Sequence, residues 1–275
     1  MCELFAMSAS APTNVSFSFR EFSRRGAADS RNPDGWGVAY FEDGDARVVR
    51  EPVPTDQSAC VRFLLDHALS SSIVMSHVRR ATQGARRLAN TQPFTRELGG
   101  RVHAFAHNGN LEGLDAPPAG GAHQPIGDTD SERAFCALLG ELARIWREPG
   151  QVPSLDERFG VVAEFAARLR PLGPANFLYS DGDALFAHGH RRTQPARGDA
   201  ILPPGLHLLT RSRSPRGERA VDATGAEAGV ALAPTERVAL FASVPLTDEP
   251  WRPLDEGEVI AARGGAVVRS TARER

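Results

Sequence analysis

The stretch Met1–Ser10, "MCELFAMSAS", places a cysteine directly behind the first methionine and then continues as an apolar run. We interpret residues 2–9 as a buried strand. Removal of Met1 would leave Cys2 with a free α-amino group, whose usual pKa of about 8 lets it act as a general base at neutral pH. Because a cysteine at this position is more often inert than nucleophilic, the hypothesis needs partner residues elsewhere in the chain.

Length and composition narrow the class of protein. The chain has 275 residues, of which 41% are hydrophobic, so it can build one large domain or two small ones. No apolar run approaches the roughly 20 residues that cross a bilayer, and no signal-peptide pattern is present. The net charge is −2 and every basic residue is arginine. Acidic residues balance the arginine clusters, so we expect solvated surface and neither a nucleic-acid nor a membrane partner.

The cysteines favour a reducing compartment, and we expect a cytoplasmic protein. They are Cys2, Cys60 and Cys136, an odd number with wide spacing and without a C-x-x-C pair. This pattern argues against a disulfide framework and against a structural zinc site. Cys60 and Cys136 lie in stretches with helical periodicity, so we interpret both as packing residues.

The pattern of elements predicts one α+β domain over residues 1–275, in which helices cover packed antiparallel sheets. The turn "DGD" at 43–45 joins two strand-like segments, 34–42 and 46–53, and predicts a hairpin. Further strands are expected at 72–81, 101–109, 175–181, 183–190, 205–210, 237–243 and 257–269. Helices are expected at 16–27, 57–69, 130–147 and 155–170, with Asp130 or Ser131 as the cap of the third. We interpret 115–125 as a loop and 211–234 as a surface excursion.

Polar clusters at or just beyond strand ends supply candidate partners for the thiol. "SHVRRATQG" (76–84) carries an arginine pair whose planar forks suit a carboxylate, although a plain surface pair would look the same. "FAHNGNL" (105–111) offers the Asn108 amide and the Gly109 N–H as an oxyanion hole, or an ordinary Asn-Gly turn. His107 beside them is interpreted as structural.

The segment "GDTDSERAF" (127–135) opens a predicted helix with acidic residues. Helix capping explains them simply, because the helix dipole favours negative charge at this end. The functional alternative is a carboxylate directed at a substrate ammonium group. Together, a thiol, an arginine, an oxyanion hole and an acid outline a site for glutamine.

The order and spacing of "MCELFAMSA", "DGWGVAYFEDG", "NTQPFTRELGGR", "AHNGNLEG" and "GDTDSERAFC" resemble those of the class II glutamine amidotransferases, which are N-terminal nucleophile hydrolases. The likeness is greatest to their free-standing YafJ-like branch and spans nearly the whole chain. It implies a four-layer αββα sandwich of two antiparallel sheets flanked by helices.

The resemblance also implies residue roles. Cys2, as the mature N-terminus, would attack the side-chain amide of glutamine. Arg79 would bind the substrate carboxylate with Thr82 as a second contact, and Asp130 would bind its amine. The oxyanion pair would be Asn108 and Gly109. The chain departs from the family motif at Arg80, usually aromatic, and at Gln83, often His or Gly.

The expected reaction is hydrolysis of glutamine, or of a γ-glutamyl amide, through a thioester, without metal or organic cofactor. His188 and His190 could suggest a metal pair, but a polar strand edge explains them better. Two alternatives stay open: a subunit that passes ammonia to a separate partner synthetase, and a non-catalytic glutamine-binding module. The oligomeric state and the physiological amide are left open.

Overall fold

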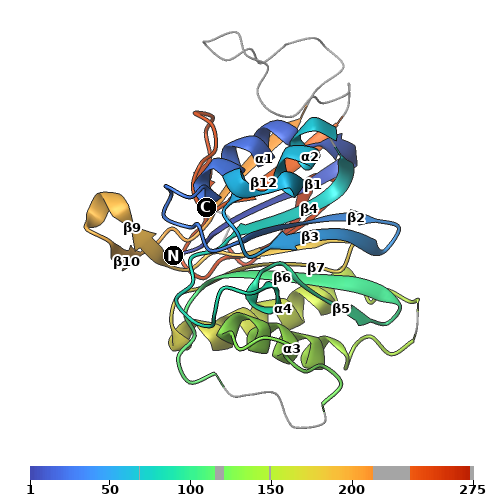
Figure 1. The fold of residues 1–275 in the computed structure, drawn as a ribbon. Helices are drawn as coiled ribbons and strands as arrows, with labels where there is room; N and C mark the ends of the chain where they lie inside the picture. The colour runs from blue at the N-terminus through green and yellow to red at the C-terminus, as the bar shows by residue number, and fades with distance from the viewer. Residues whose placement is uncertain (68, 115–120, 149, 213–235, 273–275) are drawn as a thin grey trace.

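The computed structural model describes residues 1–67, 69–114, 121–148, 150–212 and 236–272. The predicted surface excursion at 211–234 therefore lies almost entirely outside the described residues, as does half of the predicted loop at 115–125. In Figure 1 two sheets lie against each other, with one helix pair on each outer face.

The first sheet has seven strands in the order β13-β11-β12-β1-β4-β2-β3. Their bounds are β1 Glu3–Asn14, β2 Trp36–Glu42, β3 Asp45–Glu51, β4 Ser70–Val78, β11 His207–Ser212, β12 Arg237–Ala242 and β13 Arg252–Pro253. All of its paired strands run antiparallel. The N-terminal strand β1 is therefore central, held between β12 and β4.

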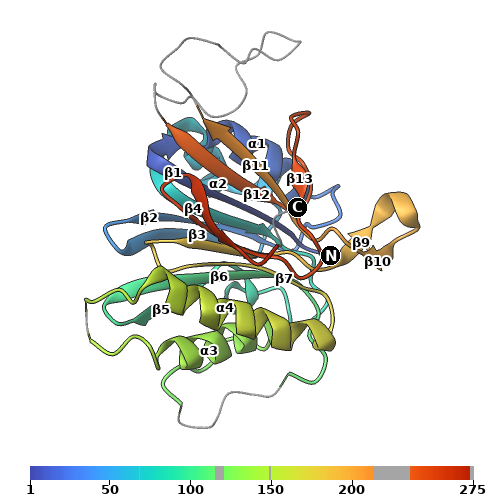
Figure 2. The same cartoon turned by 180° about the vertical axis from the view of Figure 1, so that it is seen from behind.

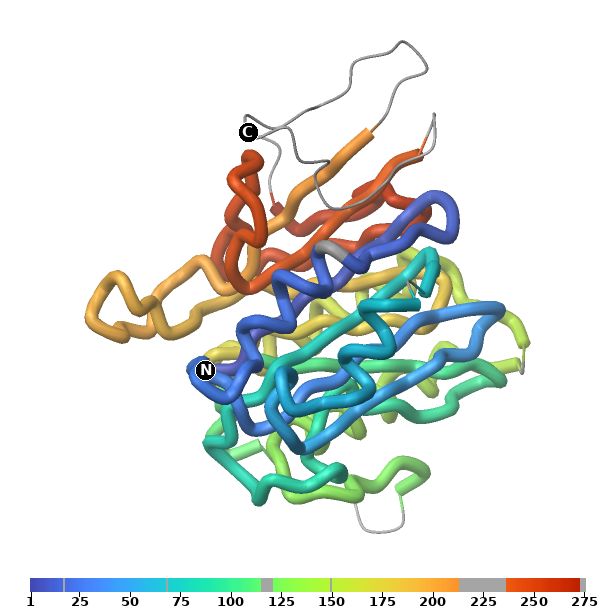
Figure 3. The backbone as a smooth tube through the Cα atoms, turned by 45° about the horizontal axis from the view of Figure 1, so that its top comes forward, coloured from blue at the N-terminus to red at the C-terminus, as the bar shows by residue number. Residues whose placement is uncertain are grey.

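The second sheet has six strands in the order β15-β14-β8-β7-β6-β5, again antiparallel. Their bounds are β5 Phe94–Leu98, β6 Arg101–Gly109, β7 Ala175–Ser180, β8 Leu185–His188, β14 Val259–Arg263 and β15 Ala266–Ser270. A separate hairpin, β9 Arg192–Gln194 with β10 Ala200–Leu202, projects beside the N-terminus (Figure 3).

Helices α1 (Ser16–Ser23) and α2 (Ala59–His67) cover the first sheet, while α3 (Asp130–Leu142) and α4 (Leu155–Leu169) cover the second (Figure 2). The four-layer α+β arrangement is thus as the family resemblance implied. Short 3-10 turns lie at Arg24–Gly26, Thr55–Gln57, Leu88–Asn90, Arg170–Leu172 and Pro195–Arg197.

Alternation along the strands builds three apolar layers, because successive side chains of a strand point to opposite faces. In β1, Phe5 and Met7 pack in the core beneath α1 and α2, whereas Leu4 and Ala6 pack between the sheets. The layer between the sheets is rich in alanine, including Ala104 of β6, so the two sheets can approach closely.

Several boundaries differ from the predictions. The hairpin turn is correct: Asp43 and Gly44 both have positive φ, as a two-residue type I′ turn requires. The cap of α3 is neither Asp130 nor Ser131. It is Thr129, whose side chain accepts a hydrogen bond from the Glu132 N–H. The helix also ends at Leu142 rather than near residue 147. The strands β5, β9, β10 and β13 were not predicted; all are short and lie at or beyond sheet edges, where alternation is weak.

Candidate active site

Polar side chains extend the layer between the sheets at one end of both sheets. Leu4, Met75, Ala106, Leu178 and Phe241 are apolar residues of that layer. A polar residue lies two positions farther toward this end from each of these apolar residues. In the same order, the polar residues are Cys2, His77, Asn108, Asn176 and Ser243. A period of two keeps each of these on the same face as its apolar neighbour. The end of the sandwich is therefore polar where its centre is apolar.

The Cys2 thiol lies against the backbone of Arg80, two residues beyond the end of β4. The Arg80 N–H donates to Cys2 Sγ at 3.2 Å, and the thiol donates to the Arg80 carbonyl at 3.4 Å. Burial raises the pKa of the Cys2 thiol, while the Arg80 N–H and the positive charges of the terminal amine and Arg79 lower it. The terminal amine and the thiol thus interact electrostatically.

The N-terminal amine is itself perturbed. Burial lowers the pKa of the Met1 α-amine, with the charge of Cys2 opposing and those of Arg80 and Arg192 assisting. The β9–β10 hairpin borders this end, since the Thr193 N–H contacts Met1 Sδ at 3.2 Å.

The Arg79 side chain is buried, and the loop that follows it in the chain wraps around its guanidinium. Its guanidinium donates to the carbonyls of Gln83 at 2.9 Å, Gly84 at 3.0 Å and Ala85 at 3.2 Å. The Gln83 amide in turn donates to Asn110 Oδ1. The loop after β4 is therefore tied to the end of β6. Thr82, on the same loop, has an exposed side chain.

Asn108 and Gly109 end β6, at the polar end of the sandwich. Asn108 Nδ2 donates to Ser243 Oγ at 3.4 Å, and the Asn108 carbonyl accepts from Asn176 Nδ2 at 2.9 Å. A Cβ built on Gly109 would collide with the Pro174 carbonyl oxygen, so only glycine fits this position. Both predicted oxyanion donors lie on the strand that faces β1 across the sandwich, and β1 and β6 are in contact.

Asp130, the first residue of α3, is buried, and its carboxylate is engaged with backbone donors. One oxygen accepts from the Leu111 N–H at 2.7 Å and the other from the Ser131 N–H at 2.8 Å. His107 approaches the same turn, with Nδ1 at 2.9 Å from Ser131 Oγ. Burial lowers the pKa of His107, against the opposing charge of Asp130. These contacts agree with the structural role expected for His107.

Sequence reasoning missed three polar residues of this end: His77, Asn176 and Ser243. Each is fully buried. A usable signal was present, because each lies two residues beyond an apolar residue on the same face of a predicted strand, namely Met75, Leu178 and Phe241. Asn176 and Ser243 lie at the ends of the predicted strands 175–181 and 237–243, and His77 lies within the segment 76–84 that carries the arginine pair.

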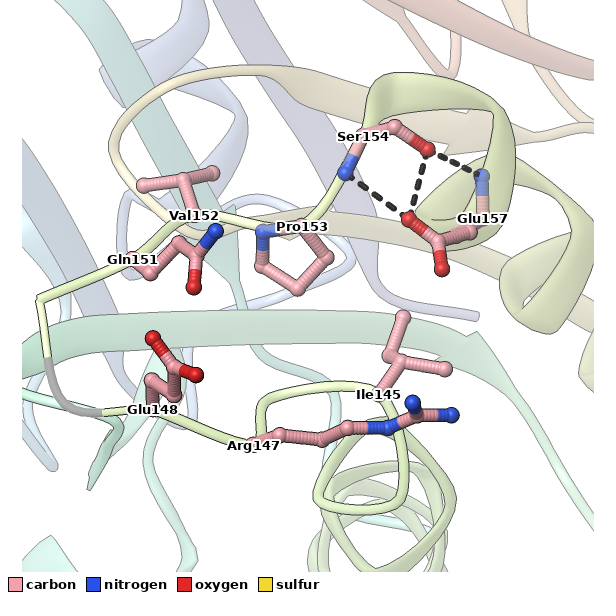
Figure 4. Close-up of a pocket in the computed structure, with 8 residues that line it drawn as sticks. All are labelled: Ile145, Arg147, Glu148, Gln151, Val152, Pro153, Ser154 and Glu157. Atoms are coloured by element: carbon pink, nitrogen blue, oxygen red, sulfur yellow. Dashed lines mark hydrogen bonds between the residues drawn. The ribbon is translucent and has the colours of Figure 1, made fainter.

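Among the described residues, a surface hollow and a helix cap lie away from this end. A surface hollow at the connection from α3 to α4 is lined by Ile145, Arg147, Glu148, Gln151, Val152, Pro153, Ser154 and Glu157 (Figure 4). Ser154 and Glu157 there form the reciprocal capping box of α4. Among the described residues, no group of three or more His, Cys, Asp or Glu is placed to hold a metal ion. No helix of the described ranges is long and apolar enough to span a membrane.

The structure combines a four-layer αββα fold with a thiol just before its central strand β1. Two comparisons with solved structures bear on it. A predicted glutamine amidotransferase from Pseudomonas aeruginosa PA01 superposes with a TM-score of 0.68 and 31% identity, covering 98% of this chain and 100% of that one. The glutamine phosphoribosylpyrophosphate amidotransferase of Bacillus subtilis superposes with a TM-score of 0.58 at 16% identity, covering 98% of this chain and 48% of that one, which is a likeness of fold alone.

Sequence comparison gives the family. The model of the class II glutamine amidotransferases matches residues 1–275. YafJ of Escherichia coli K12, a predicted glutamine amidotransferase, is 36% identical over 262 residues, which cover 94% of this chain and 96% of YafJ. This chain belongs to the class II glutamine amidotransferase family.

Proposed function

We propose that this chain is a cysteine-dependent amidohydrolase acting on the side-chain amide of glutamine or of a γ-glutamyl compound. Residues 1–275 would act as one amidotransferase domain, with Cys2 as the mature N-terminus. The observation that carries the proposal is the contact of the Cys2 thiol with the Arg80 backbone at the polar end of the sandwich, where the positive charge of Arg79 also acts on the thiol.

The proposed reaction has two steps. The α-amine of Cys2 takes the thiol proton and the thiolate adds to the amide carbon, placing negative charge on the amide oxygen. Asn108 Nδ2–H and the Gly109 N–H would stabilise that oxyanion. The C–N bond breaks, and ammonia leaves with a proton returned by the amine. Water then adds to the γ-glutamyl thioester, and glutamate leaves as the Cys2 thiol is restored.

Substrate capture would use the groups around the thiol. Arg79 suits an α-carboxylate because guanidinium and carboxylate make paired, charge-assisted hydrogen bonds. Thr82 would add a hydroxyl contact, and Asp130 would bind the α-ammonium group. In the structure Arg79 donates to loop carbonyls and Asp130 accepts from backbone N–H groups. Both would keep part of these contacts while binding substrate, since a guanidinium has five N–H donors and a carboxylate several acceptor sites.

A second candidate is delivery of ammonia to a separate synthetase. The β9–β10 hairpin next to the N-terminus supports it, because its Ile201 and Leu202 side chains are exposed at 51% and 40%. In that case glutamine hydrolysis by the isolated chain would be slow and would rise when the partner is added. A non-catalytic binding module would bind glutamine without releasing ammonia.

The test is ammonia release by untagged protein from L-glutamine and from a set of γ-glutamyl amides. Intact-mass measurement should show loss of Met1, and active enzyme that retains Met1 would exclude the mechanism. The glutamine mimic 6-diazo-5-oxo-L-norleucine should label Cys2 and spare Cys60 and Cys136. The Cys2→Ala variant should release no ammonia, whereas Cys60→Ala should behave as wild type.

A further inference from the structure

Ser243 connects the strand of the candidate nucleophile to the candidate oxyanion side chain. Its hydroxyl oxygen accepts a hydrogen bond from the N–H of Leu4, which lies two residues after Cys2, at 2.9 Å. The same oxygen accepts a hydrogen bond from Asn108 Nδ2 at 3.4 Å. Strands β1 and β6 belong to different sheets, so the Ser243 hydroxyl bridges the two sheets at the polar end.

The Ser243 backbone is fixed on both sides. Its N–H donates to the Leu4 carbonyl at 2.9 Å, which continues the β1–β12 ladder by one pair. Its carbonyl accepts from Arg192 Nη1 at 3.3 Å, and Arg192 Nη2 lies 3.5 Å from Glu3 Oε1. Because the backbone of Ser243 is held in this way, its hydroxyl has a fixed position relative to the groups that it contacts.

The Asn108 side chain has little else to define its orientation. The residue is fully buried, and its Oδ1 has no hydrogen-bond partner among the described residues. A primary amide nitrogen carries two N–H donors. When one of them points to Ser243, the other is left in a fixed direction for a developing oxyanion. Donors aimed in advance at the position of the negative charge stabilise a transition state most effectively.

We propose that Ser243 is a positioning residue that orients the Asn108 amide for oxyanion stabilisation. The inference rests on the proposed function and adds to it the residue that directly follows β12, a strand that otherwise contributes only to the fold. Ser243 touches neither the thiol nor the reacting carbonyl in this scheme and acts through Asn108.

The test compares Ser243→Ala with Ser8→Ala. Ser8 is a matched control because it too is fully buried and its hydroxyl also accepts a backbone N–H, that of Gly265 at 3.2 Å, but away from Asn108. Both variants should lower the melting temperature by a similar amount. Only Ser243→Ala should lower kcat, by about 5- to 50-fold with KM within about two-fold, in line with partial loss of one oxyanion donor.

A double-mutant cycle separates positioning from general destabilisation. In an Asn108→Ala background, Ser243→Ala should cause no further loss of kcat, because the amide it orients is gone. An equal loss of kcat in both backgrounds, or unchanged kcat in Ser243→Ala, would overturn the proposal. If Ser243→Ala does not fold, Ser243→Cys keeps the side-chain shape with a weaker acceptor, and its kcat should also fall.

The role of Ser243 can also be tested if the proposed function is wrong, because one measurement does not depend on activity. If wild-type protein releases no ammonia from any amide, the side-chain amide ¹H–¹⁵N resonances of Asn108 report on Ser243 directly. They should shift in the Ser243 variant and stay in place in Ser8→Ala. Unchanged Asn108 resonances in the Ser243 variant would overturn the positioning role without reference to activity.

Discussion

The Asp130 carboxylate accepts a hydrogen bond from the Leu111 N–H at 2.7 Å, so the first residue of α3 is tied to the backbone that directly follows the candidate oxyanion pair. Helix capping, the simple explanation for this acid, belongs instead to Thr129. Asp130 thus has two assignments: a structural one through Leu111, seen in the structure, and the proposed contact with a substrate ammonium group.

Asp130→Asn and Asp130→Ala should separate these assignments. The asparagine keeps one acceptor oxygen for Leu111 but loses the charge and the acceptor of the Ser131 N–H, so KM for L-glutamine should rise about ten-fold or more, with a smaller loss of stability than in the alanine variant. The alanine also leaves a buried N–H unsatisfied and should cost a further ~1–3 kcal/mol of unfolding free energy, measured by urea titration. Asp128→Asn, an exposed acid nearby, is the control. An unchanged KM in Asp130→Asn would remove Asp130 from the substrate site.

Arg79→Lys should weaken substrate capture more than Arg80→Lys. Lysine keeps the charge but loses the planar fork, so a loss of roughly 1–3 kcal/mol is expected, mainly in KM. Arg79 also donates to the carbonyls of Gln83, Gly84 and Ala85. The variant should therefore speed hydrogen exchange in the loop after β4, which Arg80→Lys should not do. A larger KM effect for Arg80→Lys would assign the carboxylate contact to Arg80 and shift the motif by one residue.

The helices and most of the strands could be predicted because each lies in a local pattern, and the candidate site residues were proposed from motifs at or just beyond strand ends. Alternation defined β1 and β6, and helical periodicity with polar N-terminal residues defined α3 and α4. The partners of those residues could not be predicted in the same way. The bond between Ser243 and Leu4 joins positions 239 apart in the sequence, and only the strand order β12-β1-β4 brings them together.

Buried histidines should make the protein sensitive to acid. Burial, assisted by the charge of Arg79, lowers the pKa of His77 to about 3, and burial lowers those of His103 and His188 to about 4 and about 3. An unfolded histidine titrates near 6.5, so below that pH the unfolded state binds more protons than the folded state. The free energy of unfolding should be insensitive to these groups above pH 7 and should fall from about pH 6.5 toward pH 4.

The His77→Leu variant measures how much one of these histidines contributes to the pH dependence of stability. Over the range from about pH 6 to pH 4, the wild-type free energy of unfolding should fall more steeply than that of the variant, by about 1.4 kcal/mol per pH unit. Urea denaturation at several pH values measures both slopes, and carboxylate contributions cancel in the comparison. Parallel curves would show that His77 is not held neutral in the folded protein.

Gly109→Ala and Gly140→Ala place the same methyl group in opposite surroundings. At Gly109 the Cβ would collide with the Pro174 carbonyl and lie 2.5 Å from His107 Nε2. The end of β6 must then shift, which should cost at least about 1–3 kcal/mol of unfolding free energy and move the Gly109 N–H away from the proposed oxyanion. We expect kcat to fall by about 10²–10³, the effect of losing one such donor.

At Gly140 the new Cβ meets nothing within 4 Å, and the residue lies on the exposed side of α3. Alanine is the better helix former, so this variant should gain about 0.5–1 kcal/mol and keep wild-type kcat. Urea titration and steady-state ammonia release on both variants provide the measurement. A Gly109→Ala protein with wild-type stability would contradict the close approach to Pro174. If Gly109→Ala loses stability as expected but keeps the wild-type kcat, the Gly109 N–H is not part of the oxyanion hole. The backbone would then have moved without consequence for the reaction.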